Sequence, residues 1–179
     1  MGKVFGMTER FALIDTTGNR TVVNYGKEEV DEINSTWHEV SFSKAHSEKP
    51  SIEQIKSAII EDINADVKAK IINGFEYTIL HGQQEGTLVR VWLSDTNQQN
   101  FVDLRSSADD IDYPVRYKVG QDDKGDPVYE YFADKTEIIA FSKTITQFIH
   151  QCQEEGWNEK DSFDFTPYEE ALEVMESEE

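Results

Sequence analysis

An amphipathic helix in the first half of the chain is the feature that most constrains the fold. Ser51 and Gln54 form a capping box, in which each side chain satisfies a backbone N–H group at the start of a helix. Apolar residues then recur every three or four positions, which is the period of one helix face: Ile52, Ile55, Ile59, Ile63, Val67 and Ile71. Gly74 follows where a glycine commonly ends a helix, so the pattern predicts a long helix over residues 51–73.

Two further helices are predicted toward the C-terminus. Asp134 and Glu137 form a second capping box, and the long helix that begins there is expected to end at Gly156. Its apolar stripe consists of Ile138, Phe141, Ile145, Phe148 and Cys152. A third capping box at 166–169, with a proline at the first helical position, predicts a short acidic helix to about residue 175.

Short runs rich in β-branched and aromatic residues indicate strands between the helices. These runs are 11–15, 20–25, 37–42, 75–80, 88–93, 113–119 and 128–132, with a short helix capped by Ser94. The segment 16–19, which contains Gly18 and Asn19, predicts a hairpin turn, and the charged connector at 27–34 is expected to form one helical turn. The sequence therefore predicts an α+β fold, in which small antiparallel sheets pack with two long amphipathic helices. Its expected parts are a β-rich N-terminal arm (1–49), an α+β body (50–165) and an acidic C-terminal helix and tail (166–179).

The charge of the chain is strongly negative and unevenly spread. Among 179 residues, 17 Lys and Arg face 36 Asp and Glu, which gives a net charge of −19. Residues 153–179 alone hold 11 acidic residues and one basic residue. This charge argues against direct binding to nucleic acid or to anionic lipid. No apolar run approaches the roughly 20 residues of a membrane span, and we expect no secretory signal.

The residues that usually carry chemistry form no recognisable motif. The four histidines, at positions 38, 46, 81 and 150, lie in different predicted elements, and the single Cys152 excludes a thiolate zinc site and an intramolecular disulfide. Cys152 continues an apolar stripe, so we interpret it as a small core residue. The sequence predicts no catalytic residue, no cofactor and no metal ligand, although a site built from a histidine and distant carboxylates stays open.

The three tryptophans leave one alternative for ligand binding. Trp37, Trp92 and Trp157 together with seven tyrosines would suit a sugar-stacking surface. Trp92, however, lies between Val91 and Leu93 in a predicted strand, so a core position is favoured for it. Trp157 follows the predicted helix end and is more consistent with an interface.

Two segments carry a resemblance to a known family. They are the run from Ile71 to Tyr77, with the pattern Ile-x-x-Gly-Phe-x-Tyr, and the run Trp-Leu-Ser-Asp-Thr-Asn-Gln-Gln-Asn-Phe at 92–101. With the runs at 114–120, 125–129 and 149–162, this order resembles an uncharacterised domain family of bacteriophages and prophages of gut bacteria, found in tail-fibre-type and other virion proteins. The resemblance covers residues 50–165 and transfers no catalytic residue.

The resemblance implies a non-enzymatic structural protein of the virion. We expect a component of a tail or capsid appendage, such as a fibre base, collar, ring or adaptor, assembled in the host bacterial cytoplasm. The expected partners are a second copy of the chain and other virion proteins, and the expected interface consists of Ile138, Phe141, Ile145, Phe148 and Trp157. The alternatives are a phage assembly chaperone that stays outside the virion, an acidic mimic of DNA that inhibits a host protein, and a glycan hydrolase that uses two carboxylates.

Overall fold

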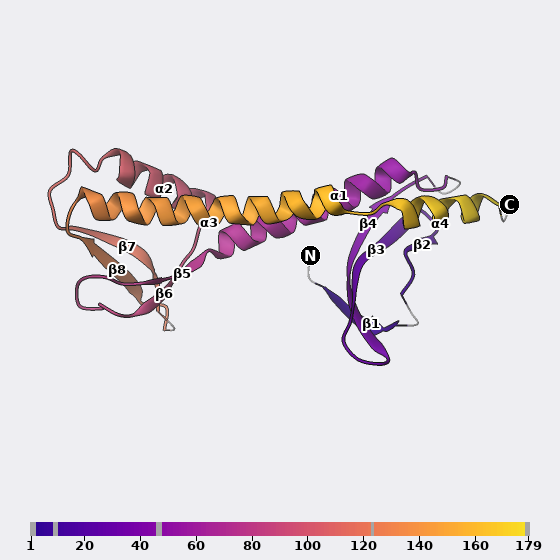
Figure 1. The fold of residues 1–179 in the computed structure, drawn as a ribbon, viewed down its shortest axis with the longest axis horizontal. Helices are drawn as coiled ribbons and strands as arrows, with labels where there is room; N and C mark the ends of the chain where they lie inside the picture. The colour runs from indigo at the N-terminus through magenta and orange to yellow at the C-terminus, as the bar shows by residue number, and fades with distance from the viewer. Residues whose placement is uncertain (1–2, 9–10, 46–47, 123, 178–179) are drawn as a thin grey trace. The chain divides into compact units, whose positions relative to one another are not determined.

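The computed structural model describes residues 3–8, 11–45, 48–122 and 124–177. These residues form the predicted α+β fold of helices and small antiparallel sheets (Figure 1). The contacts divide the chain into two units, which are Met1–Asp66 with Gly156–Glu179 (unit 1) and Val67–Glu155 (unit 2). Among the described helices, none is long and apolar enough to cross a bilayer.

Unit 1 contains an antiparallel sheet with the strand order β1-β4-β3-β2 (Figure 1). Its strands are β1 (Val4–Met7), β2 (Ile14–Thr17), β3 (Arg20–Glu29) and β4 (Asn34–Ser43). The predicted turn between β2 and β3 is present, with Gly18 at a φ of 60°. The predicted helical connector at 27–34 is wrong: β3 continues to Glu29 and turns directly into β4, because backbone pairing with β4 extends through this segment.

Two helices complete the core of unit 1. They are α1 (Ile52–Asn73), whose first fifteen residues belong to this unit, and α4 (Thr166–Ser177). The capping box predicted at the start of α1 is confirmed, because Ser51 N donates to Gln54 Oε1 and Gln54 N to Ser51 Oγ. One apolar cluster joins the sheet, α1 and the C-terminal segment, with buried members Val23, Tyr25, Val40, Ile55, Ile59, Ile63 and Tyr168. The units therefore do not follow the predicted boundaries at 49/50 and 165/166.

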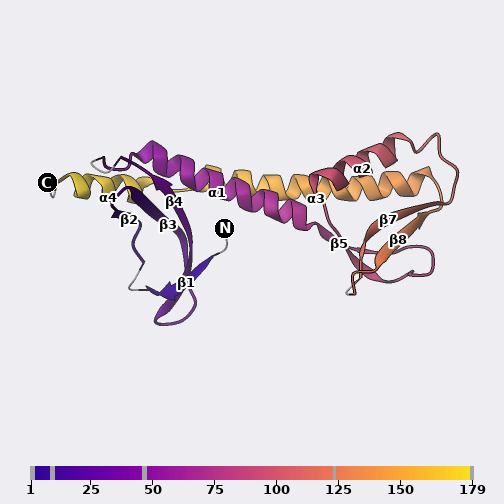
Figure 2. The same ribbon diagram turned by 180° about the vertical axis from the view of Figure 1, so that it is seen from behind.

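Unit 2 contains two β-hairpins and two helices. The hairpins pair β5 (Phe75–Thr78) with β6 (Leu88–Val91) and β7 (Val115–Gln121) with β8 (Pro127–Phe132). The helices α2 (Asp95–Ser106) and α3 (Lys135–Ser162, in this unit as far as Glu155) lie together on one side of the hairpins in both views (Figures 1 and 2). Ser94 caps α2 as predicted, because its hydroxyl accepts from Asn97 N.

The end of α3 differs from the prediction. The helix passes through Gly156 without interruption and ends at Ser162. A glycine inside a helix costs about 1 kcal/mol relative to alanine, which is a weak local preference that packing can override. Phe163 and Phe165 lie directly beyond the helix end and pack against the core of unit 1. The residues that follow the longer helix therefore make tertiary contacts.

Candidate functional site

The α3 stripe proposed as an interface lies largely inside the protein. Ile138, Phe141 and Ile145 are buried in the core of unit 2, so an interface role for these three side chains is corrected. Their helix face is covered by the hairpins and α2 of the same chain. Phe148 packs at the margin of that core against Phe75, with ring centroids 5.4 Å apart. Trp157 is half exposed, and its role in an interface stays a prediction.

The tryptophans do not form one ligand surface. Trp37 is buried, and Phe11 packs edge-on against its ring. The core position predicted for Trp92 is wrong: this side chain is 59% exposed, because β6 ends at Val91 and the alternation of the strand turns Trp92 outward. It borders a groove of about 350 Å³ together with residues that include Phe101 and Tyr117.

Two side-chain amides in the segment after Trp92 form hydrogen bonds with the backbone. Asn97 Nδ2 donates to Trp92 O at 2.9 Å, and Gln98 Nε2 donates to Leu93 O at 2.7 Å. These two bonds satisfy backbone carbonyls at the junction of β6 and α2. Of the amide side chains that line the groove, Asn97 is therefore engaged by the fold, and Asn100 and Gln121 are the other two.

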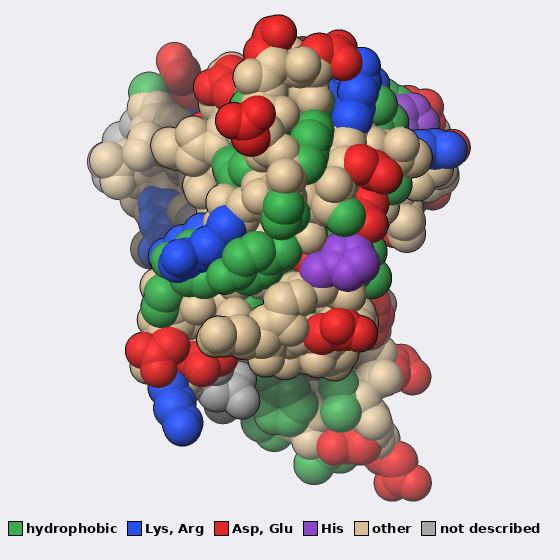
Figure 3. All heavy atoms as spheres, turned by 90° about the vertical axis from the view of Figure 1, so that its left-hand side faces the viewer, with side chains coloured by type: hydrophobic (Ala, Val, Ile, Leu, Met, Phe, Trp, Pro, Cys, Tyr) green, Lys and Arg blue, Asp and Glu red, His purple; other side chains and the backbone are tan. Residues whose placement is uncertain are grey.

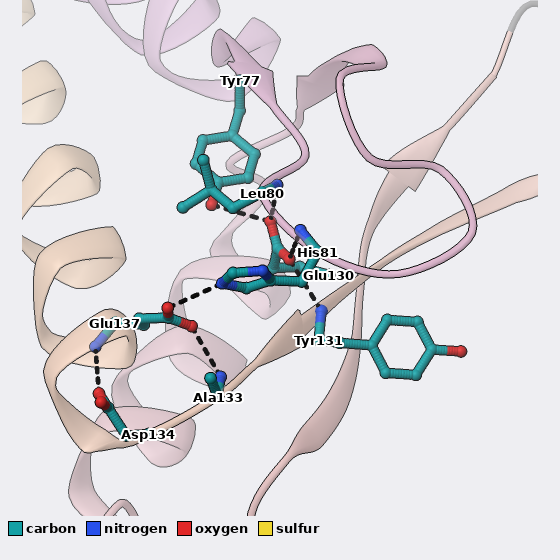
Figure 4. Close-up of polar contacts among 8 residues, drawn as sticks. All are labelled: Tyr77, Leu80, His81, Glu130, Tyr131, Ala133, Asp134 and Glu137. Carbon is teal, nitrogen blue, oxygen red and sulfur yellow. Dashed lines mark hydrogen bonds and ion pairs between the residues drawn. The ribbon is translucent and has the colours of Figure 1, made fainter.

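A buried carboxylate connects β8 to the segment that follows β5, as Figure 4 shows. Glu130 is fully buried on β8 and accepts four hydrogen bonds. Its Oε2 accepts from Tyr77 Oη (3.0 Å) and from Leu80 N (2.7 Å). Its Oε1 accepts from His81 N (3.0 Å) and Tyr131 N (2.9 Å). Burial, with the charge of Glu130 beside it, raises the pKa of Tyr77. The donors are the hydroxyl of Tyr77 and three backbone N–H groups, so this network holds the β5–β6 loop on β8.

A histidine and a carboxylate lie next to this network (Figure 4). His81 Nε2 lies 2.8 Å from Glu137 Oε1, and this hydrogen bond raises the pKa of His81. Glu137 Oε2 also accepts from Ala133 N, while Glu137 N donates to Asp134 Oδ1 at the predicted helix cap. Glu137 is thus committed to the start of α3, and the pair is a helix-end contact rather than an acid–base pair facing a cavity.

A second cluster of ionisable side chains lies in unit 1, between β4 and α1. Asp62 and Asp66 are four residues apart in α1 and therefore share one helix face. His38 Nδ1 on β4 lies 3.5 Å from Asp62 Oδ2 and 3.5 Å from Asp66 Oδ2. All three candidate ligand atoms lie within 4.8 Å of one another. The cluster combines one histidine with two carboxylates that are distant from it in the sequence, which is the kind of site that the sequence left open.

Tyr25 completes the surroundings of this cluster. Its hydroxyl donates to Asp62 Oδ2 at 2.8 Å, and its ring stacks on the His38 ring with centroids 4.9 Å apart. Burial first, and then the hydrogen bond to Asp62, raise the pKa of Tyr25. The sequence carried one signal for this site, because Asp62 interrupts the apolar face between Ile59 and Ile63.

Other candidate residues stay apart from this cluster. His150 is exposed on α3 with Glu154 one turn away, and His46 lies outside the described residues. Cys152 is buried, as predicted, and burial raises the pKa of its thiol, which lowers its reactivity as a nucleophile.

An uncovered apolar area lies at one end of the sheet in unit 1. Phe5 pairs with Thr36 and Met7 with Asn34, which places both side chains on the sheet face that also carries His38. Phe5 is 63% exposed, and Ile33 in the β3–β4 turn is 64% exposed. We call Phe5, Met7, Val30 and Ile33 the apolar tip. Further along this face, α1 covers the sheet; at the tip nothing among the described residues buries it.

The comparisons with known proteins add no identification. Searches of protein-family models, of curated proteins and of solved structures found no match to this chain.

Proposed function

We propose that the protein is a non-enzymatic structural component that acts by protein–protein contact through the apolar tip. On the sequence resemblance, we place it in a bacteriophage tail or capsid appendage. The observation that carries the contact is that the sheet face continues past the helix that covers it. Large apolar side chains grouped at such a place are typical of a surface that a partner buries.

The charges around the tip favour one kind of partner. Residues 28–32, at the end of β3 and in the turn before Ile33, contain four acidic residues and no basic residue, and of these four Glu28 pairs with Lys3. Two copies of the chain would bring two such acidic margins and two net charges of −19 together, which opposes self-association through this surface. We therefore assign the tip to another virion protein that presents apolar side chains bordered by Lys and Arg.

The role as a DNA mimic has less support. Such a mimic needs carboxylates spaced over one extended surface. On the face shown in Figure 3, acidic side chains lie in separate groups with hydrophobic, basic and neutral side chains between them. Over half of the excess charge also belongs to residues 153–179.

The test is incorporation into phage particles. Copies of the chain in washed particles of the encoding phage are counted by quantitative mass spectrometry against the portal and major capsid proteins. We expect a fixed small-integer stoichiometry for the wild type. The double variant Phe5→Ser with Ile33→Ser should lose incorporation at least tenfold. The control, Val102→Ser with Val174→Ser, removes two exposed apolar side chains elsewhere and should leave it unchanged.

The other outcomes separate the alternatives. Strong expression during infection with absence from washed particles contradicts the virion role and favours the chaperone or the DNA mimic. Displacement of DNA from a basic host protein would then identify the mimic. Equal incorporation of the tip variant and the control contradicts the assignment of the contact to the tip.

A further inference from the structure

We propose that His38, Asp62 and Asp66 bind a divalent transition-metal ion, with zinc as the ion that the ligand set suits best. The site lies within unit 1 and joins β4 to α1. It is independent of the apolar tip and of any role in a virion.

The distances between the side chains fit three ligands of one ion. Zinc binds histidine nitrogen and carboxylate oxygen at about 2.0–2.2 Å, so neighbouring ligands in a tetrahedral site lie about 3.4 Å apart. His38 Nδ1 lies 3.5 Å from one oxygen of each aspartate. This nitrogen is buried, yet it makes no hydrogen bond to any described residue. The two aspartate oxygens lie within 4.8 Å of each other, so an approach of at most about 1.4 Å would complete the tetrahedral spacing.

The charges of the cluster also favour a divalent cation. The side chain of Asp62 is 7% exposed and that of Asp66 33%, so both carboxylates are partly withdrawn from water. Two carboxylates held this close repel one another. A divalent ion would balance both charges. The ion could enter from solvent beside Asp66, whose side chain is partly exposed.

The surroundings hold the ligands in place. Tyr25 donates a hydrogen bond to the same Asp62 oxygen that would face the ion, and its ring stacks on His38. Hydrogen bonds of this kind orient metal ligands and commonly change metal affinity by about 10–100-fold. A mixed set of imidazole and carboxylate favours zinc over calcium and magnesium, which prefer oxygen ligands alone.

Calorimetric titration of the metal-free full-length protein with zinc chloride tests the site. We expect one zinc ion per chain and an increase in the melting temperature. Asp66→Asn removes the more exposed ligand and should weaken zinc binding at least tenfold while the protein stays folded. His38→Gln should do the same. His150→Gln removes an exposed histidine beside Glu154 and is the matched control, with unchanged affinity expected.

Three results would overturn the proposal. They are no zinc binding by the wild type, equal binding by Asp66→Asn and the wild type, and loss of binding in His150→Gln instead. Competition identifies the class of ion: a tenfold excess of calcium should leave zinc bound, and displacement by calcium would contradict a transition-metal site. Cobalt provides a second readout, because a tetrahedral His–Asp–Asp site should give visible absorption bands that Asp66→Asn abolishes.

Discussion

The hydroxyl of Tyr25 donates a hydrogen bond to Asp62 across 2.8 Å and so joins β3 to α1 inside unit 1. Tyr25→Phe removes this donor from a buried carboxylate. We expect the free energy of unfolding to fall by about 1–3 kcal/mol, because a buried charged acceptor loses a partner. Urea denaturation in the absence of added metal measures the loss.

A matched variant separates this bond from the general effect of removing a buried hydroxyl. Tyr168 is equally buried, but its hydroxyl donates to a neutral acceptor, Asn24 O. Tyr168→Phe should cost less, about 1 kcal/mol. Equal losses of unfolding free energy in the two variants would show that the charge of Asp62 does not strengthen its hydrogen bond with Tyr25.

The carboxylate of Glu130 is expected to be among the most sensitive groups in unit 2. Glu130→Gln replaces one acceptor oxygen by an NH₂ group that meets N–H or O–H donors. We expect destabilisation of about 3 kcal/mol, since donors of Tyr77, Leu80, His81 and Tyr131 share the two oxygens. Urea denaturation followed by circular dichroism measures it. The exposed Glu76→Gln on β5 should change stability by less than about 0.5 kcal/mol.

Gly74 is required by both conformation and space. Its φ is 67°, and a Cβ atom there would lie 1.7 Å from Val91 O. Gly74→Ala should therefore destabilise the protein by more than about 3 kcal/mol or prevent folding. At Gly18, φ is also positive, but a Cβ would meet no described atom within 4 Å. Gly18→Ala should cost only about 1–2 kcal/mol. Thermal unfolding of both variants tests this, and equal costs would contradict it.

The pair of His81 and Glu137 should make stability depend on pH. Its hydrogen bond to Glu137 raises the pKa of His81 in the folded protein above the ordinary value of 6.5. The folded state therefore holds the proton more tightly, so the stabilisation is full below pH 6.5 and is lost as the pH rises through the folded pKa.

The measurement is urea denaturation from pH 5 to pH 9 on the wild type and on His81→Gln. The stability difference between them should be largest at the acidic end and shrink as the pH rises. His150→Gln, which removes an exposed histidine of α3, is the control. A difference that is constant across this range would contradict the assignment.

The helix starts were predictable because their determinants are local. A capping box needs two residues three positions apart, and those at Ser51 and Asp134 begin helices as expected. Turn residues act over a similar range, and Gly18 forms the turn between β2 and β3. The α+β class followed from these signals together with the apolar periodicity of α1.

The end of α3 and the exposure of single side chains were not predictable in this way. Gly156 has a weak preference to end a helix, and the packing that opposes it involves residues beyond the helix. Trp92 directly follows the four residues of β6, and its exposure depends on where the pairing of β6 with β5 stops. Strand β1 was also missed, because only its pairing with β4 identifies a run of four residues.

The candidate sites show the same division between near and distant partners. The sequence by itself determined which residues form α1 and that Asp62 and Asp66 share one of its faces. Only the tertiary structure brought His38 and Tyr25 to that face and left Phe5 beyond the helix. These arrangements depend on pairing and packing between residues that are far apart in the chain. For such residues, the spacing along the sequence does not reveal the distance between them in space.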